Sequence, residues 1–174
     1  ENVLSFAKME EGREEFEFEL VDIVKLLKNL VSTIQDRIRH EGFEIRMELE
    51  NSLPSLKADS AAISQAITNL IDNAIKYSGG AKKMIVSAYK GDQFLDIAVK
   101  DFGVGIKKDE IDRVFDRFYR GGDELIRTVK GSGLGLTLVK QILEAHRGSV
   151  HVESEPGQGS TFSIRLPLQE RRDT

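Results

Sequence analysis

The fold is indicated most directly by one stretch, Met84-Ile-Val-Ser-Ala-Tyr-Lys-Gly-Asp-Gln-Phe-Leu-Asp-Ile-Ala-Val-Lys-Asp101-Phe-Gly-Val-Gly105. Residues 84–89 and 94–101 are rich in β-branched and aromatic side chains, which predicts two strands. Gly91-Asp92 between them is typical of a tight hairpin turn. The stretch therefore predicts an antiparallel hairpin whose second strand ends in a carboxylate followed by two glycines.

The segments before this hairpin alternate between strand and helix patterns. Residues 16–20 alternate as a half-buried strand, Asp22 can cap a helix that stops near Gly42, and residues 43–49 alternate as a second strand. A strongly periodic helix then occupies residues 59–77. The apolar stripe of the first helix consists of Ile23, Leu26, Leu27, Leu30, Ile34 and Ile38.

The segments after the hairpin begin with a long, weakly structured stretch. Residues 102–132 contain at most a short helix near 109–115, and a loop of this length in a compact domain is more often a functional lid than an accident. The pattern then predicts a helix at 133–147, strands at 150–152 and 162–166, and a turn at 155–159. This mixed order of strands and helices indicates an α+β fold.

Composition excludes several classes of function. The chain has 174 residues, 25 Lys and Arg against 29 Asp and Glu, and a net charge of −4 with no basic block, which disfavours a nucleic-acid-binding module. It has no Cys, so disulfides and thiolate chemistry are excluded, and its three His lack zinc-site spacing. No apolar run is long enough to span a membrane. Hard oxygen ligands remain as the metal chemistry.

A polar stripe lies beside the apolar stripe of the helix at 59–77. At about 100° per residue, Asn69, Asn73 and Lys76 share one face, next to Ile63, Ile67, Leu70 and Ala74. An Asn oxygen suits Mg²⁺ and a Lys can hold a phosphate, so the stripe could serve a nucleotide. The alternative is that any amphipathic helix has polar residues beside its core face.

Two glycine-containing motifs also point to a ligand. In residues 101–105 the glycines let the backbone approach a flat ligand, and Asp101 can accept a hydrogen bond from an exocyclic amine, although an ordinary turn is the alternative. Residues 131–136 open a helix, where anions bind favourably, although Ser132 could be a plain N-cap. This second motif matches neither the Rossmann nor the Walker pattern.

Two further segments carry weaker signals. Residues 157–161 could form a hairpin connection. Residues 115–120 hold aromatic and Arg side chains, which fit either a lid that reaches phosphate or an apolar anchor; the anchor suits Phe115 and Phe118. For Arg117, Arg120 and Lys130, solvated charge is the default interpretation.

The order of these pieces resembles the ATP-binding catalytic domain of bacterial sensor histidine kinases, in the superfamily of gyrase, heat-shock chaperone and mismatch-repair ATPases. The resemblance covers residues 16–168, and residues 4–12 look like the end of the preceding dimerisation helix. In the terms of that family, the N box is 69–78, the first glycine box 101–105, the F box 115–118 and the second glycine box 131–135.

The resemblance implies a two-layer α/β sandwich with a mixed, mostly antiparallel sheet of about five strands, three main helices on one face and a long ATP lid. The implied units are the end of the phosphoacceptor helix (1–12), the ATP-binding domain (13–168) and a C-terminal tail (169–174). Because the chain begins with Glu1, we expect it to be a piece of a longer protein.

The resemblance also implies roles for single residues. Asp101 should bind the adenine amino group and Asn73 should ligate Mg²⁺, while Asn69 and Lys76 complete the catalytic set. Tyr77 belongs to the phosphate side. The remaining residues of the implied ATP site are Gly103, Gly105, Ile106, Phe115, Tyr119, Arg120, Gly131, Ser132, Gly133, Leu134, Gly135, Leu136 and Thr161.

The implied reaction is transfer of the γ-phosphoryl group of ATP to a histidine on a dimerisation domain, and none of His40, His146 and His151 has the acceptor context. The chain alone is therefore expected to bind ATP as a monomer without phosphorylating itself. Implied partners are that dimerisation domain, in a homodimeric parent, and a response regulator. The domain would be cytoplasmic, and any membrane anchor would belong to the parent.

Three alternatives remain open at this point. An ATP hydrolase of the superfamily would need a Glu base where this chain has Asn69, which cannot accept a proton. Asp72, the nearest carboxylate, projects about 100° away. A protein-serine kinase of the anti-sigma-factor type and a non-catalytic docking module are the other two.

Overall fold

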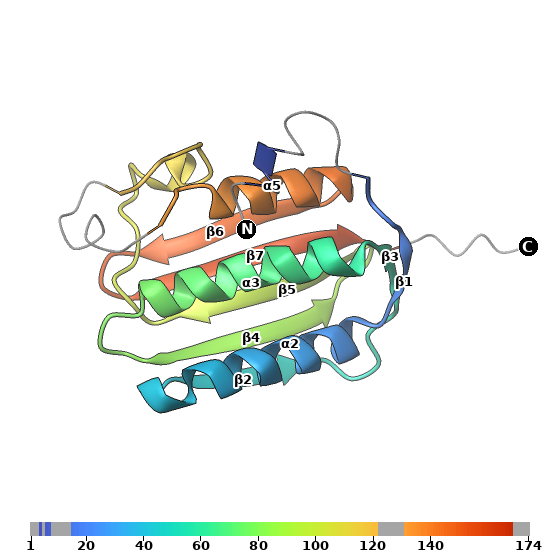
Figure 1. Cartoon of the computed structure of the whole chain (residues 1–174), viewed down its shortest axis with the longest axis horizontal. Helices are drawn as coiled ribbons and strands as arrows, with labels where there is room; N and C mark the ends of the chain where they lie inside the picture. The colour runs from blue at the N-terminus through green and yellow to red at the C-terminus, as the bar shows by residue number, and fades with distance from the viewer. Residues whose placement is uncertain (1–3, 5, 8–14, 122–130, 169–174) are drawn as a thin grey trace, which may run out of the picture.

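A five-stranded sheet covered on one face by three helices makes up most of the computed structural model, which describes residues 4, 6, 7, 15–121 and 131–168 (Figure 1). The strands lie in the order β2-β4-β5-β7-β6, and within this part of the chain β2 and β4 are the one parallel pair. The predicted α+β sandwich is thus confirmed. The strands are β2 Glu44–Leu49, β4 Lys83–Lys90, β5 Phe94–Asp101, β6 Ser149–Glu155 and β7 Gly159–Pro167.

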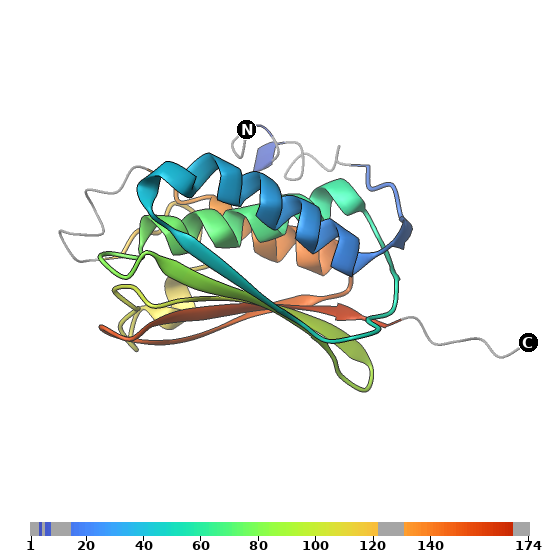
Figure 2. The ribbon, with the colours of Figure 1, turned by 90° about the horizontal axis from the view of Figure 1, so that it is seen from below.

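The helical layer consists of α2 (Ile23–Ile38), α3 (Ser60–Lys76) and α5 (Gly135–Ala145). Figure 2 shows all three on the same side of the sheet, and α3 lies between the other two in Figure 1. The core fills the space between the layers: residues 95–99 and Asp101 of β5 are buried, as are the predicted apolar residues of α3. This arrangement fixes the neighbouring polar stripe of α3 at one end of the sandwich.

The helix boundaries follow the predicted caps. Asp22 accepts a hydrogen bond from the backbone N–H of Lys25 at 3.0 Å, and Asp59 accepts one from Ala62 at 2.9 Å. Gly42 ends the short 3₁₀ turn Arg39–Glu41 in the left-handed conformation. In α2 the predicted Leu30 is half-buried, whereas Val31 is buried, so the apolar stripe is rotated slightly from the expected one.

Several elements differ from the prediction. The first strand, β1, is Glu19–Val21 rather than 16–20, and it pairs with β3 (Leu56–Ala58), which no pattern predicted. Phe16 and Phe18 lie outside the strand, and their rings pack against His146 at centroid distances of 5.4 and 4.8 Å. The predicted helix near 109–115 is only the 3₁₀ turn η2, Ile111–Arg113.

The ends of the chain are described only in part. Residues 4, 6 and 7 are helical, while the rest of the expected dimerisation-helix end and the tail at 169–174 lie outside the described residues. The expected domain limits therefore stay a prediction. Within the described ranges, no helix has the length and apolarity needed to cross a bilayer.

Candidate functional site

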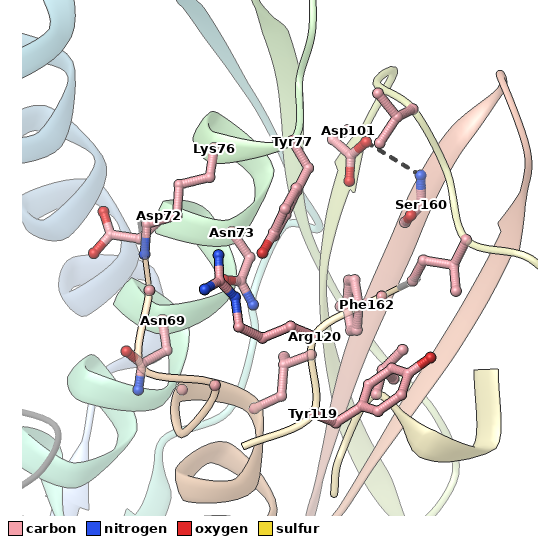
Figure 3. Close-up of a pocket in the computed structure, with 18 of the residues that line it drawn as sticks. Asn69, Asp72, Asn73, Lys76, Tyr77, Asp101, Tyr119, Arg120, Ser160 and Phe162 are labelled. Carbon is pink, nitrogen blue, oxygen red and sulfur yellow. Dashed lines mark hydrogen bonds between the residues drawn. The ribbon is translucent and has the colours of Figure 1, made fainter. Parts of the chain in front are cut away.

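A cavity opens between α3, the start of α5 and the ends of β5 and β7, with the segment 104–121 as its outer wall. It encloses about 1090 Å³ of space, which includes open solvent at its mouth. Its lining brings together segments far apart in the sequence, and Figure 3 shows their side chains converging.

The α3 side of the cavity carries the predicted polar stripe. Asn69, Asn73 and Lys76 all line it, together with Tyr77 at the end of the helix (Figure 3). Arg120 comes from the opposite wall. Burial raises the pKa of Tyr77, and the positive charge of Arg120 opposes this rise. Amides and cations therefore meet on one side of the cavity, which suits an anionic ligand.

Asp72 borders the same side, but its charge is already compensated. Its Oδ1 lies 2.7 Å from Nη2 of Arg37 on α2. Figure 3 shows the carboxylate turned toward α2, away from Asn73. This agrees with the expectation that Asp72 projects differently from Asn69, and it leaves little negative charge to repel an anion.

Asp101 lies at the opposite end of the cavity and is only 4% exposed. Its Oδ1 accepts hydrogen bonds from the backbone N–H groups of Gly103 (2.9 Å) and Ser160 (3.2 Å). Desolvation nevertheless outweighs these bonds and raises the pKa of the carboxyl. Both bonds go to Oδ1, so Oδ2 is not used by either of them.

The segment after Asp101 is held by close backbone contacts that only glycine permits. A Cβ on Gly103 would lie 1.9 Å from the carbonyl oxygen of Tyr77, and one on Gly105 would lie 2.0 Å from that of Glu155. Gly105 also has a φ of +69°, which disfavours other residues. Gly103 therefore packs behind the cavity, while Gly105 and Ile106 line it.

The outer wall is anchored by one aromatic ring and closed by another. Phe115 packs edge-on against Phe162 at 6.3 Å, whereas Phe118 is 68% exposed with a φ of +58°, so the anchor interpretation is wrong for Phe118. Tyr119 donates a hydrogen bond to Oε1 of Glu110 at 3.0 Å, and Arg113 stacks on its ring. Burial and Glu110 raise the pKa of Tyr119.

Most of the predicted site residues lie together in this cavity. Those that line it are Asn69, Asn73, Lys76, Tyr77, Asp101, Gly105, Ile106, Tyr119, Arg120, Gly131, Ser132, Gly133, Gly135 and Leu136. Four do not line it. Gly103 and Phe115 pack behind the wall, and Leu134 is buried as the N-cap residue of α5, which starts at Gly135 rather than 133.

Thr161, the fourth, requires a correction. Strand alternation in β7 turns Ser160 and Phe162 to the helix side, where both line the cavity, and places Thr161 beside Lys100 and Glu153 on the other face. The period of two counted back from Phe162 could have identified Ser160. Lining residues that the sequence analysis did not assign to the site are Asp72, Val104, Glu110, Val114, Gly121, Ser160 and Phe162.

Comparison with known proteins is consistent with this geometry. Residues 58–170 match the model of the family described as "Histidine kinase-, DNA gyrase B-, and HSP90-like ATPase". Sensor protein RprX of Bacteroides fragilis is 33% identical over 170 residues, which cover 97% of this chain and 33% of RprX. Sensor histidine kinase WalK of Bacillus subtilis is 33% identical over 178 residues, with coverages of 99% and 28%.

A solved structure shows the same fold. Full-length ShkA in complex with AMPPNP superposes with a TM-score of 0.82 and 30% identity, covering 95% of this chain and 34% of the ShkA chain. The chain thus spans about a third of the length of the curated relatives it matches.

Proposed function

This chain belongs to the family of histidine kinase-, DNA gyrase B- and HSP90-like ATPases, as the catalytic domain of a histidine kinase. We propose that its cavity holds Mg-ATP for phosphoryl transfer to a histidine on a dimerisation domain. The observation that carries this proposal is the buried Asp101 carboxylate across the cavity from the Asn and Lys stripe of α3. One end suits an amine-bearing base and the other suits phosphates.

At the adenine end, Oδ2 of Asp101 would accept a hydrogen bond from the exocyclic amine. The apolar side chains of Ile106, Leu136 and Phe162 line the space around it and suit the faces of a purine ring. Gly103 and Gly105 would act indirectly, since their missing Cβ atoms let this wall approach the neighbouring backbone.

At the phosphate end, Asn69, Lys76 and Arg120 would hold and orient the anionic oxygens. The N-terminus of α5 borders the same region through Gly135, and its dipole favours negative charge. The ion pair between Asp72 and Arg37 supports this assignment because it removes an uncompensated carboxylate from the phosphate side.

Asn73 is the residue that would hold Mg²⁺. It lines the cavity with a neutral, hard oxygen, and among the described residues no group of three or more His, Cys, Asp or Glu could build a metal site of protein ligands alone. This fits an ion that takes few protein ligands and is held largely by phosphates. When bound, Mg²⁺ would supply charge neutralisation on the transferring phosphoryl group.

The side chains of this site support transfer rather than hydrolysis. Asn69 is an amide and Asp72 is paired with Arg37, so neither is poised to activate water. The domain would instead act by positioning and electrostatic stabilisation. No specific observation favours the hydrolase or the docking-module alternative.

The acceptor histidine is proposed to lie on the dimerisation domain. None of the three histidines lines the cavity in the described part of the chain, and both ring nitrogens of His146 are engaged, with Asp59 N–H and Ile142 C=O. In the same proposal, the domain is cytoplasmic and monomeric alone, its parent is a homodimer, and a response regulator takes the phosphoryl group onward.

Calorimetric titration with ATP, in the presence and absence of Mg²⁺, tests the proposed ligand. We expect saturable heat with one site per chain and tighter binding with Mg²⁺. If neither titration gives heat, the cavity is not an ATP site and the docking-module alternative is favoured.

A further inference from the structure

Ser154 is a polar residue at a position where strand alternation calls for an apolar one. It follows Val150 and Val152 on the helix-facing side of β6, is half-buried, and stands opposite Ser160 of β7 in the sheet register. It does not line the cavity itself. Its hydroxyl is therefore placed just behind the cavity floor.

The Ser154 hydroxyl joins three parts of the site. Its Oγ lies 2.8 Å from the backbone N of Ile106, 2.9 Å from the carbonyl oxygen of Gly159 and 2.8 Å from Oγ of Ser160. Ile106 belongs to the cavity wall and Ser160 to the floor. One hydroxyl thus couples the wall to the floor.

The number of protons decides which way these bonds run. A serine hydroxyl has one proton to donate and two lone pairs that accept. The Ile106 N–H can only donate to Ser154, and the Gly159 carbonyl can only accept from it. With its proton used on Gly159, Ser154 can bond Ser160 only as the acceptor, so the Ser160 proton must point at Ser154 and away from the cavity.

This arrangement leaves acceptors on the cavity floor. The lone pairs of Ser160 and Oδ2 of Asp101 are both acceptors, since Oδ1 of Asp101 is occupied by two backbone N–H groups. A pair of acceptors matches an exocyclic amine with its two N–H groups. The same pair repels a carbonyl oxygen at that position.

We propose that Ser154 is a positioning residue that fixes the Ser160 hydroxyl as an acceptor and thereby selects a 6-amino purine over a 6-oxo purine. This inference rests on the proposed function, because it assumes that the base end of a purine nucleotide lies against Asp101. Ser154 acts through Ser160 and touches no ligand.

The test compares ATP with inosine triphosphate, which carries a carbonyl oxygen in place of the 6-amino group. Binding of both is measured by calorimetry on the full chain. In Ser154→Ala the Ser160 hydroxyl loses its acceptor and can turn its proton toward the carbonyl. We expect the preference for ATP over inosine triphosphate to fall by about three- to tenfold, the value of one neutral hydrogen bond.

Two variants distinguish a specific effect on the Ser160 hydroxyl from a general loosening of the cavity wall at Ile106. Ser154→Thr keeps the hydroxyl and should retain the wild-type preference. Ser163→Ala removes a hydroxyl from the opposite face of the same sheet, next to Ala98 and His151, and should also leave the preference unchanged.

The outcomes distinguish this inference from the proposed function. If wild type binds neither nucleotide, the proposed function fails and this inference fails with it. If wild type prefers ATP but Ser154→Ala weakens both nucleotides equally, or if Ser154→Thr loses the preference as Ala does, Ser154 is only structural and this inference alone is overturned.

Discussion

Asp101 has a carboxylate that is buried and only partly hydrogen-bonded by the rest of the protein. The carboxylate is buried, which costs free energy, and two backbone N–H groups hydrogen-bond to Oδ1 rather than to Oδ2. A group that is costly to bury and incompletely used by the fold itself is typical of a functional site. At the residue scale, the proposed function makes recognition of the base depend on this side chain.

Asp101→Asn tests that dependence with little change in shape. The amide oxygen can still accept from Gly103 and Ser160, but an NH₂ group would replace Oδ2 and face the donors of the adenine amine. We expect ATP affinity to fall about 10- to 100-fold, as for loss of a hydrogen bond to a charged group. Calorimetry measures the change, and Asp92→Asn in the β4–β5 turn is the matched control. An unchanged affinity would show that the base lies elsewhere.

The raised pKa of Asp101 gives the folding stability a specific pH dependence. The folded protein holds this proton more tightly than the unfolded chain, so the contribution is fully present at low pH and is lost as the pH rises through the folded-state pKa. Asp101→Asn cannot titrate. We therefore expect wild type to lose stability relative to this variant with rising pH in the acid range. Urea unfolding at a series of pH values would refute this if the difference stayed constant.

At the scale of elements, the cavity wall depends on how the loop after β5 meets the β6–β7 turn. Gly157 N–H donates to the Val104 carbonyl at 2.8 Å, and Ile106 N–H donates to Ser154. Gly105 lies between these two bonds with no room for a side chain. The loop and the turn therefore form one unit that holds the wall in place.

Gly105→Ala should separate this unit. The new Cβ would clash with the Glu155 carbonyl, and the alanine would have to adopt a left-handed φ. We therefore expect a loss of about 1–3 kcal/mol in unfolding free energy, together with weaker ATP binding. Gly80→Ala is the matched control, because a Cβ there meets nothing within 4 Å and Gly80 does not line the cavity. Equal melting temperatures and affinities for the two variants would contradict the docked-loop account.

Elements specified by local signals could be predicted from the sequence, and those specified by distant partners could not. α2 and α3 carry their own N-caps and apolar stripes, and β4 and β5 carry a turn between them. β3, in contrast, is three residues long and exists through its pairing with β1, far away in the sequence. The packing of the Phe16 and Phe18 rings likewise depends on His146, which lies far away in the sequence.

At the scale of the whole molecule, the sandwich assembles one cavity from segments spread over the chain. The family resemblance that the order of the sequence motifs carries predicted most of its lining. The N box and the first glycine box lie at the ends of α3 and β5, and the second glycine box lies at the start of α5. The error at Thr161 and the omission of Ser160 have one cause: a motif fixes a segment, whereas the face that each side chain occupies depends on strand register. The apolar character of Phe115 correctly predicted its role as an anchor. The same reasoning was wrong for Phe118, whose ring is exposed.

In the proposed reaction, this domain supplies the phosphoryl donor and another domain supplies the histidine. The most direct measurement mixes the chain with Mg²⁺, γ-labelled ATP and the separately produced dimerisation domain of its parent, and then follows acid-labile phosphate on each component. We predict label on the dimerisation domain, much less with Asp101→Asn, and none on this chain alone. Stable label on the chain itself, or none on the dimerisation domain despite bound ATP, would contradict the account.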